Sequence, residues 1–201
     1  MHSALSMKRQ TSNPEGTGTA EEPKKKASRI SARDIAYVGL MVAVIEVCKA
    51  ALSGLPNVEL TSFWIIMFTV CFGWRIIAIV PVFILIEGMI YGVHVWWIMY
   101  LYVWPFLAFL AWIFRKREEP LFWAVLSGAF GLSFGYLCSL VYLVMGLTEN
   151  GLTDAIHTQM AWWVAGIPYD LIHCAGNFVF MLLLYKPIKK AIKKVAVTPE
   201  L

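Results

Sequence analysis

The sequence predicts an all-α polytopic membrane protein with six transmembrane helices and both termini in the cytoplasm. Of its 201 residues, 59% are apolar and only 15% are charged, and the mean hydropathy is +0.66. Soluble domains carry about 25% charged residues. The apolar residues form runs near the length of about 20 that crosses a bilayer, with Lys and Arg gathered between the runs. This pattern excludes a disordered chain, a disulfide-framework protein and an ordinary cytosolic enzyme.

Six apolar segments follow one another along the chain. The expected helices cover residues 32–52, 60–73, 75–92, 96–114, 120–145 and 160–185. The second and third are divided at Gly73-Trp74-Arg75, because the apolar stretch 60–92 is too long for a single tilted span. Five spans would result if 60–92 were one bent element. The polar stretch 146–159 predicts a loop, and Lys186-Pro187 predicts the end of the sixth helix.

The ends of the chain differ from its apolar middle. Residues 1–31 are polar and basic and lack the apolar core of a signal peptide, so we expect a disordered cytoplasmic tail there. Residues 32–190 form the predicted membrane domain, and residues 191–201 a cytoplasmic C-terminal tail.

Basic residues favour six spans over five. With six spans, 16 of the 17 Lys and Arg residues fall on the cytoplasmic side, and the expected outer loops contain Glu59, Glu149 and Asp154 but no Lys or Arg. Lys49, within the first helix, is the exception. Five spans would place Arg75 inside a helix and one basic cluster outside. We therefore expect a multi-pass protein of the cell membrane, and the basic residues give no reason to expect nucleic acid.

Ionisable residues inside the expected spans are few, and such residues normally face a bundle interior or a water-filled cavity. Glu46 and Lys49 are three residues apart and can pair on one helix face, and Glu87 lies in the third segment. Asp170, His173 and Asn177 form one stripe of the sixth. That stripe predicts either a ligand cavity or a hydrogen-bond network that fastens helices.

Aromatic residues collect near the second expected outer loop and at the start of the sixth helix. Rings there either form an interfacial belt or stack on a flat ligand. The candidates for ligand contact are Tyr91, Trp96, Trp97, Tyr100 and Trp163. In the first outer loop, Asn57 and Glu59 place polar groups at the membrane surface.

Small residues recur at helical spacing in two segments, where they allow close approach of another helix. The first segment carries Ala32, Ala36, Gly39 and Ala43, a candidate surface for a partner subunit. The fifth carries Gly128, Gly131, Gly135 and Ser139, for which packing within the chain is the simpler interpretation.

Catalytic and metal-binding motifs are absent from the sequence. The four cysteines lie in separate apolar runs without metal-ligand or disulfide spacing. We therefore expect no enzyme activity, no cofactor and no metal site.

Taken together, these residues resemble the substrate-binding S components of energy-coupling factor (ECF) transporters, over about residues 32–190. The resemblance rests on the six short helices and on the motifs Ala32-x-x-x-Ala36, Leu55-Pro56-Asn57-Val58-Glu59, Phe72-Gly73, Glu87-Gly88-x-x-Tyr91-Gly92, Trp97-x-x-Tyr100-Leu101-Tyr102 and Trp163-x-x-Gly166-Ile167-Pro168-x-Asp170-x-x-His173-x-x-Gly176-Asn177.

The resemblance implies a subunit of an ABC-type importer that captures a vitamin or related micronutrient at the outer face. It implies docking through Ala32 and Ala36 onto a transmembrane coupling subunit driven by two cytoplasmic ATPases, since this chain has no ATP motif. The implied site includes Asn57, Glu59, the region 91–100, Asp170, His173 and Asn177. A cobalamin, flavin or pterin class of ligand would suit the aromatic content.

Two other functions fit the same residues. A stand-alone secondary transporter would use Glu46, Lys49 or Glu87 in a proton relay. A structural membrane subunit would use the polar stripe of the sixth helix only to fasten helices.

Overall fold

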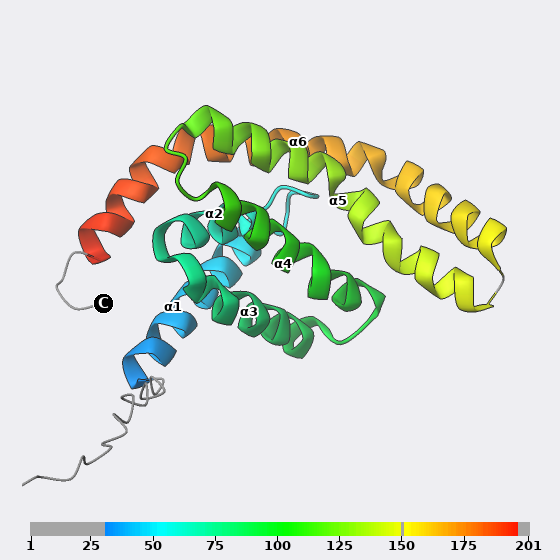
Figure 1. Ribbon diagram of the computed structural model, residues 1–201, viewed down its shortest axis with the longest axis horizontal. Coiled ribbons are helices and arrows are strands. Elements are labelled where there is room, and N and C mark those ends of the chain that lie inside the picture. Colours follow the sequence, from blue (N-terminus) through cyan, green and yellow to red (C-terminus); the bar gives the residue numbers. More distant parts are fainter. Residues whose placement is uncertain (1–30, 150, 197–201) are drawn as a thin grey trace, which may run out of the picture. The chain divides into compact units, whose positions relative to one another are not determined.

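The structure is a computed structural model that describes residues 31–149 and 151–196, so the predicted tail at 1–31 lies almost wholly outside the described residues. The described residues form one compact unit, and every regular element in it is helical. The helices are α1 (Ala32–Ala51), α2 (Thr61–Phe72), the 3₁₀ turn η1 (Gly73–Arg75), α3 (Ile76–Tyr91), α4 (Val95–Phe114), α5 (Pro120–Glu149) and α6 (Leu152–Ala196) (Figure 1). For the described residues, the all-helical class and the presence of six α-helices are confirmed.

The predicted break between the second and third helices is also confirmed. Gly73 has φ of 61°, a left-handed conformation that favours glycine, and it follows the last residue of α2. The 3₁₀ turn Gly73–Arg75 then leads directly into α3. The chain therefore divides its long apolar stretch with one glycine-dependent turn.

The predicted sixth helix was too short at both ends. The polar stretch 146–159 is mostly helical, because α5 continues to Glu149 and α6 begins at Leu152, with Gly151 (φ 85°) between them. Asp154 lies in the first turn of α6, where the helix dipole favours an acidic side chain. At the other end α6 passes through Pro187 and continues to Ala196. Proline weakens a helix interior but does not always end it when tertiary contacts hold both sides.

Among the described residues, three helices are long and apolar enough to cross a membrane: Val95–Phe114, Pro120–Glu149 and Leu152–Lys194. Helices α2 and α3 are apolar but have only 12 and 16 residues. Helix α1 has 20 residues and carries Arg33, Asp34, Glu46 and Lys49. By length and composition the chain is a membrane protein.

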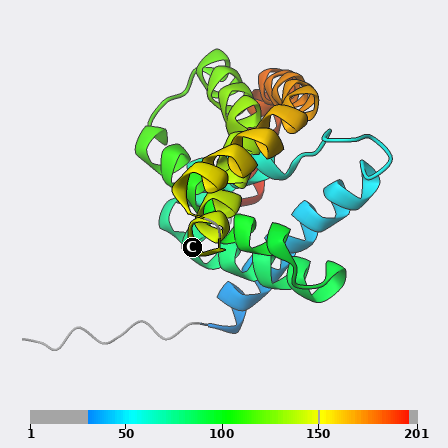
Figure 2. The same cartoon turned by 90° about the vertical axis from the view of Figure 1, so that its right-hand side faces the viewer.

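Helices α5 and α6 lie side by side and share the most extensive packing in the described chain (Figures 1 and 2). The small residues of α5 make this approach possible, as predicted. A Cβ atom added to Gly131 would lie 2.9 Å from the backbone carbonyl atoms of His173, and one added to Gly128 would lie 3.3 Å from Cβ of Phe178. Side chains larger than hydrogen at these positions would separate the two helices.

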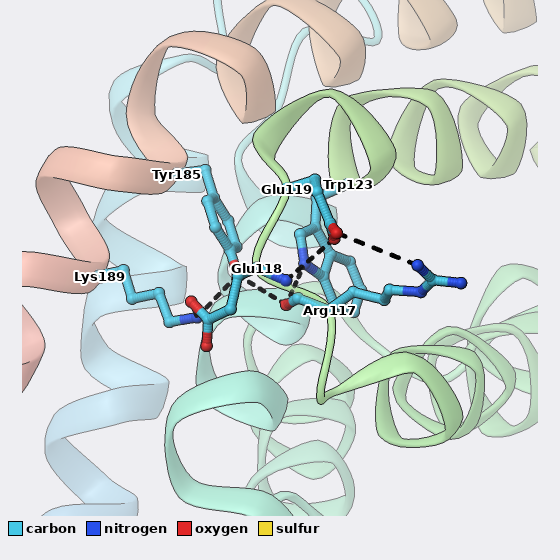
Figure 3. Close-up of polar contacts among 6 residues, drawn as sticks. All are labelled: Arg117, Glu118, Glu119, Trp123, Tyr185 and Lys189. Carbon is cyan, nitrogen blue, oxygen red and sulfur yellow. Dashed lines mark hydrogen bonds and ion pairs between the residues drawn. The ribbon is translucent and has the colours of Figure 1, made fainter.

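A polar cluster ties the loop between α4 and α5 to the far part of α6 (Figure 3). Lys189 donates to Glu118 Oε2 at 2.6 Å and to the Tyr185 hydroxyl at 2.9 Å. The Arg117 carbonyl oxygen accepts from Trp123 Nε1 at 3.1 Å and from the Tyr185 hydroxyl at 3.3 Å. The hydrogen bond from Lys189 holds the pKa of the Glu118 carboxyl below its usual value. These contacts flank Pro187 and account for the continuation of α6 beyond it.

Replacing Gly131 with alanine should destabilise the protein by about 1–3 kcal/mol, because the new methyl group meets backbone atoms that cannot move aside easily. The free energy of unfolding in detergent would measure the effect. Gly166→Ala is the matched control, since nothing lies within 4 Å of a Cβ added there. Equal stability of the two variants would contradict tight packing at Gly131.

Candidate functional site

A cavity of about 430 Å³ lies where the loop after α1 meets helices from the rest of the bundle. Its lining comes from α1 and that loop, α3, α4, α5 and α6. The lining residues are Lys49, Leu52, Ser53, Leu55, Pro56, Asn57, Val58, Glu59, Glu87, Tyr91, Trp96, Tyr100, Phe134 and His173. The volume lies within the range of about 300–1,000 Å³ that is typical of small-molecule sites.

Local turns shape the loop that forms one wall of the cavity. The Leu55 N–H donates to the Leu52 carbonyl at 2.9 Å, and the Val58 N–H donates to the Leu55 carbonyl at 3.2 Å. Asn57 has φ of 54°, a left-handed conformation that asparagine tolerates better than most residues. The Thr61 hydroxyl donates to Glu59 Oε2 at 3.0 Å and so fixes the carboxylate at the start of α2.

Seven of the eleven residues expected to contact a ligand line this single cavity. They are Asn57, Glu59, Glu87, Tyr91, Trp96, Tyr100 and His173. They come from one loop and three helices, so the fold brings together positions more than a hundred residues apart in the sequence.

Two of the other expected residues fasten α5 to α6 outside the cavity lining. Asp170 accepts from the Gly135 N–H at 2.9 Å, and Asn177 Nδ2 donates to the Ser127 carbonyl at 3.3 Å. Both side chains are buried. On this stripe, His173 faces the cavity, while Asp170 and Asn177 join α5 to α6. The stripe therefore contributes both to a cavity and to a hydrogen-bond network between helices.

The remaining two expected residues, Trp97 and Trp163, also lie outside the cavity lining. Trp97 Nε1 donates to the Ile84 carbonyl at 2.8 Å, which ties α4 to α3. The ring of Trp163 packs edge-on against Tyr136, with 5.2 Å between ring centroids. Of the adjacent pair Trp96 and Trp97, only Trp96 faces the cavity.

The predicted pairing of Glu46 with Lys49 is wrong. Lys49 forms its ion pair with Glu87 of α3, whose side chain is only 1% exposed. Glu46 lies next to Glu87, and its Oε1 atom is buried without a hydrogen-bond partner. Glu87 is more deeply buried than Glu46, and a buried carboxylate without a nearby cation lowers the stability of the fold more than a partly exposed one does. The pair also joins α1 to α3 at the edge of the cavity.

Aromatic rings surround the Lys49 ammonium group. Its Nζ atom lies 5.0 Å from the ring centroid of Tyr91 and 5.5 Å from that of Tyr100. These are cation–π distances. The wall of the cavity therefore already holds one cation against aromatic faces.

Glu59 and His173 face each other without a direct hydrogen bond. His173 Nε2 lies 3.7 Å from Glu59 Oε1, and the imidazole is 2% exposed with Nε2 unpartnered. The ring of Phe134 packs edge-on against the imidazole at 4.8 Å between centroids. Burial raises the pKa of the Glu59 carboxyl, while the Lys49 charge and the Thr61 hydroxyl act in the opposite direction. A donor or acceptor on a ligand could satisfy both groups.

The other seven lining residues were not among the expected ligand contacts: Lys49, Leu52, Ser53, Leu55, Pro56, Val58 and Phe134. The position of Lys49 in the last turn of the first helix was a usable signal, because that turn leads directly into the loop with Asn57 and Glu59. Phe134 gave no signal, since one phenylalanine among the apolar residues of α5 looks like any other.

The candidate docking residues lie on the open face of α1. Ala32, Ala36, Gly39 and Ala43 are all exposed. Met41, Val42 and Ile45 on the other face are buried, and α1 packs with α2 and α3. The structure therefore leaves the small-residue face uncovered.

Metal-ligand geometry is lacking within residues 31–149 and 151–196, where no three His, Cys, Asp or Glu side chains group around one point. Comparison with models of protein families, with curated proteins and with solved structures found no match to this chain. The candidate site therefore rests on its own geometry.

Replacing Lys49 with methionine should destabilise the protein by about 3–5 kcal/mol, because it leaves Glu87 buried without its cation. The double variant Lys49→Met/Glu87→Gln should recover much of that loss, since it removes both charges. Unfolding in detergent of the two single variants and the double variant would measure the coupling. Additive effects would contradict a structural ion pair.

Proposed function

We propose that the chain is the substrate-binding S component of an ECF-type importer in the cell membrane. In this role it captures a vitamin or related micronutrient at the outer face. It then works with a transmembrane coupling subunit and two cytoplasmic ATPases that supply the energy. The proposal combines the motif resemblance of the sequence with the geometry of the cavity.

The observation that carries the proposal is the composition of the cavity wall. A loop with fixed polar groups, an ion pair and aromatic rings line one space of about 430 Å³ within an apolar helical bundle. Buried polar atoms without partners, Glu87 Oε1 and His173 Nε2, belong to residues of that lining. Leaving such groups unsatisfied costs free energy, which a bound ligand would recover.

The topology in this proposal has six spans and cytoplasmic termini. It follows the distribution of Lys and Arg, with α2 and α3 acting as short spans joined by the turn at Gly73–Arg75. The loop 53–59 then lies at the outer side, and the cluster around Lys189 lies at the cytoplasmic side.

The purified chain should form a stoichiometric complex with one member of a vitamin panel, observed by native mass spectrometry from detergent. His173→Ala should weaken that complex about tenfold, because it removes a buried polar contact inside the cavity. His157→Ala is the matched control, since His157 does not line the cavity. Equal affinity of both variants would remove His173 from the site, and no adduct with any vitamin would count against the proposed function.

Enlarging the exposed face of α1 should disrupt assembly. Ala32→Trp/Ala36→Trp should lose copurification with the coupling subunit and ATPases, because close helix approach requires small residues. Ala165→Trp, at an exposed position of α6, should copurify as the wild type does. Unchanged copurification of the α1 double variant would refute docking through this face.

A second candidate function, a proton-coupled secondary transporter, is favoured by one observation. Glu46, Glu87 and Lys49 form a partly buried group of ionisable side chains at the cavity edge, and such groups can relay protons. Uptake that follows the proton gradient and needs no ATP would favour this function over the first.

A further inference from the structure

We infer that the cavity selects a planar nitrogen heterocycle with a cationic, aminopyrimidine-type edge, and that Glu59 receives that edge. This inference rests on the proposed binding function and narrows it to one ligand chemistry. It depends on the charges, the aromatic rings and the size of the cavity.

The charges of the cavity do not balance. Its lining contains two carboxyl groups, Glu59 and Glu87, and one ammonium group, that of Lys49. Lys49 pairs with Glu87, and the Glu59 carboxyl has no Lys or Arg partner within the described residues; the ionisable group facing it is His173, whose Nε2 atom lies 3.7 Å from Glu59 Oε1. Glu46 adds a third carboxyl group next to Glu87. A cationic ligand is therefore the kind that compensates the excess negative charge.

Burial disfavours the ionised form of Glu59 and so raises the pKa of its carboxyl group. A cation placed beside the carboxyl would oppose this effect and keep the group ionised. An anionic ligand would instead increase the excess negative charge of the cavity, and it would have to displace Glu87 to pair with Lys49.

Two polar atoms of the lining have no hydrogen-bond partner among the described residues. Glu87 Oε1 and His173 Nε2 are buried and unpartnered, and each belongs to a side chain that is 1% or 2% exposed. Lys49 already donates to Glu87. The carboxylates of Glu59 and Glu87 accept hydrogen bonds, so a ring edge with several N–H donors matches them better than an edge of carbonyl oxygens.

Aromatic rings and size restrict the ligand further. Tyr91, Trp96, Tyr100 and Phe134 provide flat faces, and Tyr91 and Tyr100 already hold an ammonium group at cation–π distance. A volume of about 430 Å³ is near the lower end for small-molecule sites. It suits one or two fused rings and is too small for a corrinoid.

Three probes of similar ring size test the inference by equilibrium dialysis against the detergent-solubilised full chain, with detergent micelles alone as the blank. 2,4-Diaminoquinazoline carries the cationic edge, quinazoline-2,4-dione replaces its amino groups with carbonyls, and quinoline-2-carboxylate is anionic. The diamino probe should bind at least about tenfold more tightly than the other two, as expected for a charge-assisted hydrogen bond.

Variants locate the binding. Glu59→Gln should weaken binding of the diamino probe at least about tenfold, and Tyr91→Leu should weaken it without changing any charge. Glu119→Gln, an exposed carboxyl outside the cavity, is the matched control and should bind as the wild type does. Gel filtration and thermal unfolding would verify that each variant is folded.

Equal or tighter binding of the dione or the carboxylate would overturn the inference, as would retention of affinity in both cavity variants or no binding of any probe. These failures differ from failure of the proposed function. A vitamin adduct of another chemistry in native mass spectrometry would preserve the binding function and remove only this ligand class.

Discussion

The free-energy cost of holding charge among apolar side chains shapes the centre of this molecule. Glu87 is almost fully buried on α3, and it depends on Lys49 from the end of α1 for its cation. That pair brings α1 and α3 together where the loop with Glu59 begins. Because desolvated charges need close partners, the position of the pair fixes one edge of the cavity. The aromatic rings around Lys49 and the polar loop then complete its wall.

Close helix packing supplies the opposite wall. Gly128, Gly131 and Gly135 allow α6 to lie directly against α5, which places His173 beside Phe134 and opposite Glu59. Asp170 and Asn177, on the same stripe, bond to α5 backbone atoms and hold this arrangement. A single polar stripe thus combines a cavity residue with two fastening residues, and the fastening residues position the cavity residue.

Much of the candidate site could be predicted. Ionisable residues inside apolar segments carry a large desolvation free energy, so they usually face a cavity or a partner. That reasoning found Glu59, Glu87 and His173. It assigned Asp170 and Asn177 to the site as well, since helical spacing alone cannot say which member of a stripe meets a cavity and which meets a backbone carbonyl. It also paired Lys49 with its near neighbour Glu46, because a partner on another helix cannot be read from local spacing.

The sequence by itself determined the all-helical class, the division of the chain into six helices and the glycine-dependent turn at residue 73. These features follow from local composition, helix length and backbone sterics. Only the tertiary structure decided that α6 continues through Pro187, that Glu87 is the partner of Lys49, and that residues from five helices and one loop line a single cavity. Those outcomes depend on contacts between segments far apart in the chain, and a local sequence pattern does not predict the energies of such contacts.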